Sequence, residues 1–168
     1  MAADFSNQIA SSQTPVYNSA NNYWSVSSYN KIDVNNDGEI QIIEAQAIKW
    51  LNVNNSNISD FTGIEAFTNL EYLDCGDNQI TSLNVPGLTN LRYLNCRNNQ
   101  LANLIVSGST NLHTLNCYDN QLPNLNVSGL TNLQDLECGR NQLTYLNLKN
   151  GRSGYWIDLG FDNNPNLH

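Results

Sequence analysis

Residues 91–104 read Leu-Arg-Tyr-Leu-Asn-Cys-Arg-Asn-Asn-Gln-Leu-Ala-Asn-Leu, and this stretch decides the fold. The frame Leu-x-x-Leu-x-Cys-x-x-Asn-Gln-(Leu/Ile)-x-x-Leu begins again at residues 70, 112 and 133, so its period is 21 residues. A fixed period of this length predicts a solenoid, in which each unit buries its apolar face against its neighbours. The cysteines that mark the four units are Cys75, Cys96, Cys117 and Cys138.

Each unit begins with a predicted strand. Leu94 and Cys96 alternate with the more polar Tyr93, Asn95 and Arg97, and this period of two indicates a strand that is buried on one face only. Stacked units would build a parallel sheet with strands about 4.8 Å apart. Equivalent residues of successive units then form columns that run across the sheet.

Two asparagine series keep the same period. The first lies where the chain turns away from each predicted strand, and its side-chain amides are expected to bond the backbone of adjacent coils. Its members are Asn78, Asn99, Asn120 and Asn141. The second series precedes each new strand and is expected to serve another turn. It consists of Asn69, Asn90, Asn111 and Asn132.

The repeat resembles the leucine-rich repeat family, whose core reads Leu-x-x-Leu-x-(Leu/Cys)-x-x-Asn-x-Leu. The match covers roughly residues 51–146, and the short unit with cysteine at the sixth position is similar to bacterial surface and secreted members. The resemblance implies an α/β-type repeat solenoid with a parallel β-sheet on one face and mostly irregular turns on the other. It also implies that the sheet face is the binding surface.

The chain is expected to have two parts. Residues 51–168 would form the solenoid, with about five repeats and a partial last one, so that the chain ends inside its array. Residues 1–50 would form a cap with a short helical region, because the end of a solenoid exposes apolar core. Within the cap, residues 33–44 read Asp-Val-Asn-Asn-Asp-Gly-Glu-Ile-Gln-Ile-Ile-Glu, which fits the twelve-residue EF-hand loop.

This loop predicts a calcium site. Calcium is a hard ion that accepts about seven oxygen ligands in loose geometry. The predicted ligands are the side chains of Asp33, Asn35 and Asp37, the carbonyl of Glu39, Gln41 through water, and both carboxylate oxygens of Glu44. The loop resembles the lone EF-hand or dockerin-type loops of extracellular bacterial proteins. A single loop suits a structural ion, and the alternative is an acidic turn that binds nothing.

A helix is expected to leave this loop. It should run from Glu44 to Trp50, with Ala45, Ile48 and Trp50 available for burial. The four cysteines share one inward strand position, so they are predicted to be reduced core residues. Disulfides between them would strain the parallel sheet, and stacked thiols do not converge on a tetrahedral zinc site.

Composition excludes several function classes. Seven Lys and Arg residues against fifteen Asp and Glu give a net charge of −8, which disfavours nucleic-acid binding. No apolar run approaches the roughly 20 residues that cross a bilayer, and residues 1–4 carry no signal-peptide pattern, so neither is expected in this sequence. No catalytic motif is found, and an open sheet offers no cleft for a carboxylate pair, so catalysis is not expected.

The outward strand positions are the candidate binding surface. Tyrosines among amides and carboxylates suit protein or glycan recognition, because aromatic rings give contact area at low entropy cost. The candidate residues are Tyr72, Asp74, Tyr93, Asn95, Arg97, Asn116, Tyr118, Asp135 and Glu137. The sequence therefore predicts a monomeric, secreted or cell-surface recognition module. The alternative is a calcium-stiffened spacer in a larger surface protein with no ligand of its own.

Overall fold

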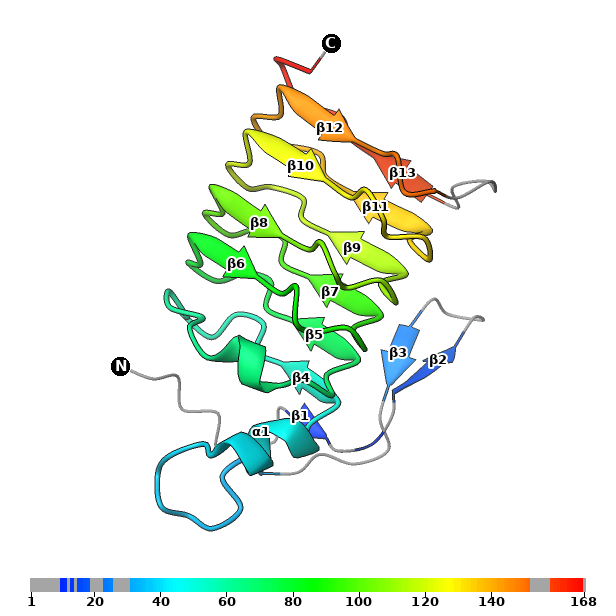
Figure 1. Ribbon diagram of the computed structural model, residues 1–168. Helices are drawn as coiled ribbons and strands as arrows, with labels where there is room; N and C mark the ends of the chain where they lie inside the picture. Colours follow the sequence, from blue (N-terminus) through cyan, green and yellow to red (C-terminus); the bar gives the residue numbers. More distant parts are fainter. Residues whose placement is uncertain are drawn as a thin grey trace.

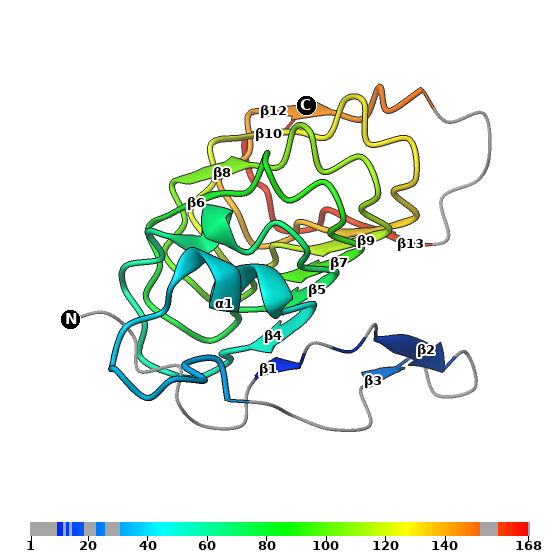
Figure 2. The same ribbon diagram turned by 60° about the horizontal axis from the view of Figure 1, so that its bottom comes forward.

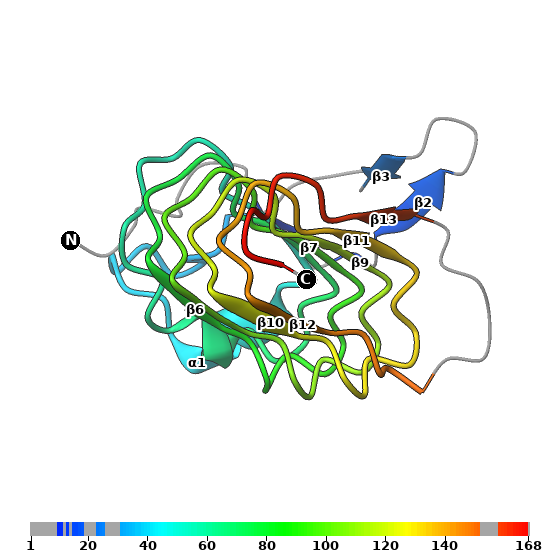
Figure 3. The same ribbon diagram turned by 90° about the horizontal axis from the view of Figure 1, so that it is seen from above.

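The computed structural model is a solenoid of stacked coils (Figure 1). It describes residues 31–151 and 158–167, together with the short stretches 10–11, 13, 15–18 and 23–25. The coils superpose in the view along the stack, with a large sheet on one side and a second row of short strands on the other (Figure 3). This is the parallel-strand solenoid that the repeat predicts.

The large sheet has seven strands in the order β1-β4-β5-β7-β9-β11-β13. All neighbouring pairs are parallel except β1 with β4, which is antiparallel and covers the N-terminal edge. The strands are β1 (Ala10–Ser11), β4 (Trp50–Asn52), β5 (Tyr72–Asp74), β7 (Tyr93–Asn95), β9 (Thr114–Asn116), β11 (Asp135–Glu137) and β13 (Asp158–Gly160).

The opposite side of each coil combines turns with one short strand. These strands are β6 (Ser82–Asn84), β8 (Asn103–Ile105), β10 (Asn124–Asn126) and β12 (Tyr145–Asn147). They form two separate parallel pairs, β6-β8 and β10-β12. Pro123 explains the gap between β8 and β10: the amides of Ala102 and Thr144 donate to the preceding coil, whereas proline has no N–H for this bond.

The remaining elements lie before or within the first coils (Figure 2). They are the antiparallel pair β2 (Val16–Asn18) and β3 (Tyr23–Ser25), the helix α1 (Ile42–Ala47) and the 3-10 turn η1 (Ile64–Ala66). The expected helix to Trp50 is wrong at its end, because Ile48 is already extended and Trp50 pairs with Tyr72 in the sheet. Within the described residues, no helix has the length and apolar character to span a membrane.

The core lies between the two rows of strands. In β5, β7, β9 and β11, the central leucine and the cysteine that follows the strand are fully buried, at 0% exposure. All four thiols are free, and the Sγ of Cys75 and Cys96 each donate to the carbonyl of Asn95 or Asn116 in the next coil, at 3.4 Å. The prediction of reduced core cysteines is confirmed, and burial raises the pKa of Cys138 to about 12.

The predicted asparagine ladder is also confirmed. The Nδ2 of Asn120 donates to the carbonyls of Cys96 and Cys117 at 3.0 and 3.1 Å, and its Oδ1 accepts the amide of Leu101 at 2.9 Å. Each amide side chain thus joins two coils at groups that the sheet leaves unpaired. Asparagines of the second series also join neighbouring coils. Asn132 Nδ2, for example, donates to the Thr110 carbonyl of the preceding coil at 2.9 Å.

Candidate functional site

An aromatic stack crosses the N-terminal half of the outward sheet face. The rings of Trp50 and Tyr72 have centroids 3.5 Å apart and planes 4° apart, and those of Tyr72 and Tyr93 are 4.4 Å and 2° apart. The in-register pairing of their strands places the three rings in one column. Trp50 and Tyr72 are only 1% and 6% exposed, whereas Tyr93 is partly exposed.

Sequence reasoning missed Trp50 as the first ring of this column. It assigned Trp50 to the end of a helix, although Trp50 stands 22 residues before Tyr72, one unit upstream. The repeat spacing, extended by the single extra residue of the first unit, was the signal that could have found it. The aromatic stack on the outward sheet face therefore begins with a buried tryptophan, and the repeat spacing places this residue in the sheet.

The next column is polar and tightly bonded. Oδ1 of Asp74 accepts the amide of Gly76 at 3.1 Å and the side-chain Nδ2 groups of Asn95 at 3.0 Å and Asn54 at 3.5 Å. Burial nevertheless raises the pKa of Asp74 above its ordinary value, because these bonds only partly offset desolvation. Asn95 is itself buried, and Asn116 follows it in register.

Substituting Asp74→Asn is expected to stabilise the fold at pH 7. Asparagine already occupies this column at Asn95 and Asn116, where its Oδ1 accepts the backbone amide two residues on. The folded-state pKa of Asp74 is raised, so its destabilising charge appears as the pH rises through that pKa. Urea denaturation should show a gain at pH 7 that disappears at pH 3. An equal gain at both pH values would contradict the role of the buried charge.

Two arginines lie beyond the ends of the strands, Arg97 one residue after Cys96 and Arg140 two residues after Cys138. Nη2 of Arg97 lies 3.4 Å from Oδ2 of Asp77, and Nη1 of Arg140 lies 3.9 Å from Oδ2 of Asp119. The Arg140 guanidinium also lies over the ring of Tyr118, 5.5 Å from its centroid. Both arginines thus have acidic partners on the turns that follow the strands.

Carboxylates dominate the C-terminal half of the face. Asp135 and Glu137 lie on β11 and pair in register with Asp158 and Gly160 on β13. The Glu137 carboxylate occupies the space that a side chain at Gly160 would need. Burial raises the pKa of Glu137, and the nearby Asp158, Asp162 and Asp135 carboxylates raise it further. This half of the face therefore carries concentrated negative charge.

The structure thus divides the predicted binding residues into two groups. Tyr72, Asp74, Tyr93 and Asn95 form an aromatic and amide group in the N-terminal half, and Asp135 and Glu137 belong to the acidic group. Asn116 lies between the two groups on β9. Arg97 and Tyr118 lie toward the turn side, beyond the ends of the strands.

The predicted calcium loop closes upon itself. Asp33 Oδ1 accepts the amide of Asn36 at 2.7 Å, and Glu44 accepts the amides of Val34 at 2.8 Å and Gln41 at 3.0 Å through its two carboxylate oxygens. Asn36 and Gly38 take the left-handed backbone, with φ of 63° and 88°. The side chain of Glu44, which is 8% exposed, therefore folds back across the loop from the first turn of α1.

These residues fit a hard, oxygen-binding cation. Side-chain oxygens accept backbone amides of the same loop at four of these residues, Asp33, Asn35, Asp37 and Glu44. The hydrogen bond from the Glu39 amide is the main cause that lowers the pKa of Asp37. Carboxylate, amide and carbonyl oxygens are the donors that calcium prefers. The apolar side chains of Ile32, just before the loop, and Ile40, within it, pack against the core. The loop is thereby attached to the first coil.

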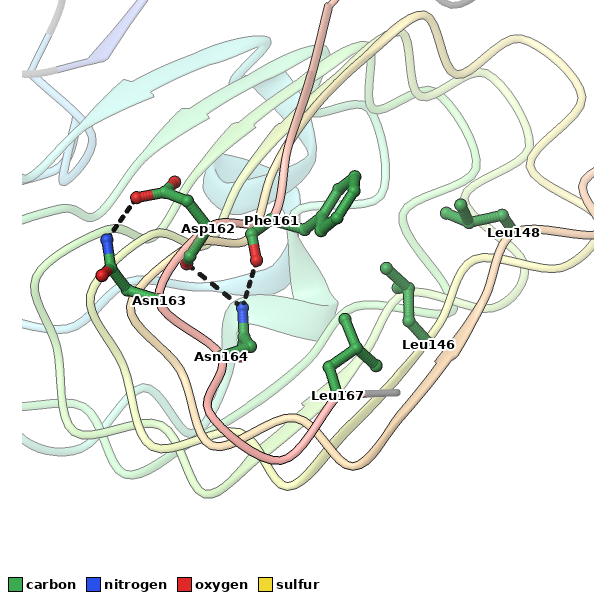
Figure 4. Close-up of a pocket in the computed structure, with 7 residues that line it drawn as sticks. All are labelled: Leu146, Leu148, Phe161, Asp162, Asn163, Asn164 and Leu167. Carbon is green, nitrogen blue, oxygen red and sulfur yellow. Dashed lines mark hydrogen bonds between the residues drawn. The ribbon is translucent and has the colours of Figure 1, made fainter.

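A separate apolar cavity lies at the C-terminal end of the stack (Figure 4). Phe161, which is 47% exposed, occupies the strand position that cysteine fills in the four preceding coils. Its ring and the leucines 146, 148 and 167 border a space of about 500 Å³. The Nδ2 of Asn164 continues the asparagine ladder with a bond to the Cys138 carbonyl at 3.1 Å. The last coil is thus joined to the stack in the same way as the others.

Comparison with known proteins agrees with the fold. The family model described as leucine rich repeats (2 copies) matches residues 46–87 and 68–109. The functional domain of InlJ from Listeria monocytogenes, described as including a cysteine ladder, is 38% identical with a TM-score of 0.71, over 76% of this chain and 28% of that one. No curated protein sequence matches significantly.

Two further solved structures are similar. A leucine-rich repeat protein from Leptospira interrogans is 25% identical with a TM-score of 0.56, over 62% of this chain and 32% of that one. An internalin, InlF of L. monocytogenes, is 23% identical with a TM-score of 0.46, over 67% and 41%. The chain spans less than a third of the InlJ and Leptospira structures. The matched repeats and the observed solenoid show that the chain is a leucine-rich repeat protein with bacterial internalin-like structural neighbours.

Proposed function

We propose that this chain is a non-catalytic recognition module that binds a protein partner through the outward face of its seven-stranded sheet. The observation that carries the proposal is the arrangement of one face, where an aromatic stack runs in register into a group of carboxylates. Aromatic rings supply rigid apolar contact area, and charges beside them select the partner. Leucine-rich repeat proteins generally bind protein partners with this face.

The proposed location is the bacterial surface or the extracellular medium. Internalin-like structural neighbours support it, since internalins are surface or secreted proteins. Free cysteines are compatible with this location because each thiol is fully buried. The partner itself has to be identified for this chain, which spans only 28% of the InlJ domain.

The proposal includes a structural calcium ion in the cap. Asp33, Asn35 and Asp37 would bind through side-chain oxygens and Glu39 through its carbonyl. Gln41 would bind through water, and Glu44 through its carboxylate. The ion would replace the internal hydrogen bonds by which these side chains now hold the loop. Its role would be to stiffen the entry into α1 and the first strand of the sheet.

A peptide-display selection tests the binding face. A random peptide library is selected on the immobilised chain, and the enriched peptides are measured against the double variant Tyr93→Leu, Tyr118→Leu. We expect at least a tenfold loss of affinity, because both substitutions remove rings from the outward face. The matched control is Tyr145→Leu, which removes a 57% exposed tyrosine from β12 on the opposite side.

Three outcomes would contradict the proposal. Equal affinity for the double variant and the control would place the binding surface elsewhere. Failure to enrich any peptide that depends on the sheet face would favour the spacer. Enrichment of glycans rather than peptides in a parallel array would replace the protein partner by a sugar.

A further inference from the structure

The second row of strands starts one coil later than the large sheet. The first coil contributes β4 to the large sheet, whereas the second row begins with β6 in the second coil (Figure 1). Phe61 precedes Leu83 by 22 residues, the same interval that separates Leu51 from Leu73. Residues 60–62 of the first coil therefore correspond to β6, but they do not form a strand.

A local turn explains the missing strand. Oδ1 of Asp60 accepts the amide of Thr62 at 2.9 Å and its hydroxyl at 2.6 Å, which is the bonding of an Asx turn. Gly63 then takes the left-handed backbone, with φ of 99°, and its amide donates to Oε2 of Glu65 at 3.1 Å. The chain thus turns away from β6 and enters η1.

The edge of β6 that faces the first coil is unpaired. The amide of Val85 donates to the Ile105 carbonyl of the β8 coil at 2.9 Å. The backbone groups of a parallel strand alternate between its two sides, so Ser82 and Asn84 direct their N–H and C=O groups away from β8. Within the part of the chain that the structure describes, no backbone hydrogen bond joins them to residues 59–66.

A groove lies beside this edge. It has a volume of about 500 Å³ and is bordered by β6 and by the turn of the first coil. Phe61, Ile64 and Leu83 contribute buried apolar side chains to it, whereas Ser82 and Asn84 are exposed. An unpaired edge with available donors and acceptors is a template for the addition of another strand.

The groove has an acidic rim. Asp60 and Glu65 line it, and both residues are exposed. Oδ2 of Asp60 and Oε1 of Glu65 take no part in the hydrogen bonds that these carboxylates accept from described residues. None of the described residues that line the groove is basic. A cationic side chain would therefore complement the rim.

We propose that the free edge of β6 is a docking site for an extended segment of a partner polypeptide that carries lysine or arginine. The segment would join the second row as a strand, in the place where the first coil has none. Its backbone would bond Ser82 and Asn84, and its basic side chain would lie at Asp60 and Glu65. The site lies across the core from the outward face of the large sheet, so it is independent of the proposed function.

A basic polypeptide fits the groove better than the alternatives. A second copy of the chain would bring its own Asp60 and Glu65 to the same edge, and these like charges would repel each other. The same carboxylates disfavour nucleic acid. A glycan has hydroxyl groups, but it has no regular row of N–H and C=O groups to match a strand.

Hydrogen exchange in the free chain tests whether the edge is unpaired. We expect the amide of Asn84 to exchange about a hundred times faster than the bonded amide of Val85. Sedimentation velocity in the same buffer reports the oligomeric state. Protection of Asn84 in a monomer would show that the edge is already paired and would overturn the proposal. Protection in a dimer would replace the partner polypeptide by a second copy.

A peptide titration tests strand addition. The probe is N-acetyl-Thr-Lys-Val-Lys-Thr amide, and the amide chemical shifts of the chain report its binding. We expect saturable shifts at Ser82 and Asn84. Replacing both lysines of the peptide by glutamate should weaken binding at least tenfold, and replacing its valine by proline should abolish binding, because proline has no N–H to donate. Equal binding of the three peptides would overturn the proposal.

Two variants of Thr81 locate the peptide on this edge. The Thr81 amide holds the position from which Ala102 donates to the preceding coil at 3.0 Å, and Pro123 stands at the equivalent position two coils on. Thr81→Pro should therefore keep the fold, remove an edge donor and weaken the peptide at least tenfold. The matched control Thr81→Ala keeps the amide and should bind within twofold of the wild-type chain. Unchanged binding to Thr81→Pro would contradict the edge site.

The acidic rim has its own test. The double variant Asp60→Asn, Glu65→Gln should weaken the lysine peptide about tenfold. The control Asp119→Asn, Asp158→Asn removes the same charge from exposed positions on the side of the large sheet and should leave binding unchanged. Equal losses in the two double variants would reduce the effect to net charge and overturn the role of the rim.

One further variant separates this site from the binding face. The double variant Tyr93→Leu, Tyr118→Leu should bind the lysine peptide like the wild-type chain. A loss in this variant would move the peptide to the sheet face and overturn the edge site, while the proposed function of that face would stand.

Discussion

Replacing Asn120 by alanine is expected to lower the free energy of unfolding by about 3 kcal/mol or more, because each buried polar group left unsatisfied costs about 1–3 kcal/mol. The side chain of Asn120 serves the amide of Leu101 and the carbonyls of Cys96 and Cys117. All three groups lie inside the stack, where water does not replace the lost amide. Equilibrium denaturation in urea measures the loss.

The matched control is Asn132→Ala. Asn132 belongs to the second asparagine series, is partly exposed and donates one bond to the Thr110 carbonyl. Its removal should lower the unfolding free energy by less than about 1 kcal/mol, since water can reach the freed carbonyl. Similar losses for Asn120→Ala and Asn132→Ala would mean that the amide ladder does not hold the coils together.

Calcium is expected to raise the melting temperature of the protein by several degrees relative to the same sample in chelator. A ligand that binds only the folded state at one hundred times its Kd stabilises it by about 2.7 kcal/mol. In a protein of this length, such a gain corresponds to roughly 5–10 °C. Differential scanning calorimetry in excess calcium and in EDTA measures the shift.

The variant Glu44→Gln isolates the loop. Glutamine cannot bind calcium with two carboxylate oxygens, so the calcium-dependent shift should shrink to near zero, whatever the variant's own stability. The control Glu65→Gln changes an exposed carboxylate on η1 and should keep the full shift. Superimposable melting curves of the wild-type chain in calcium and in EDTA would contradict the proposal that a calcium ion stabilises the cap.

Repetition explains why so much of the fold was predictable. Leu94, Cys96 and Asn99 recur with one spacing. Each of them therefore contacts the equivalent residue of the neighbouring coil, and these contacts can be predicted from the spacing alone. Thus the inward leucines, the free thiols and the amide ladder were all predicted from position alone. The outward columns followed from the same spacing.

The unpredicted features lie where the period breaks. Trp50 stands in an imperfect first unit, so helix periodicity obscured its place at the head of the aromatic stack. The split between β8 and β10 comes from Pro123, a local backbone effect inside an otherwise regular unit. The position of the Glu137 carboxylate over Gly160 depends on a missing side chain one coil away, which no pattern within a single unit reveals.

Every column on the binding face depends on the coils lying in register, and sulfur anomalous diffraction tests that register most directly. We expect the Sγ atoms of the four cysteines to form a single row with neighbours about 4.8 Å apart, one strand spacing. Two sulfurs at bonding distance, about 2 Å, or positions that do not fall on one row would contradict it.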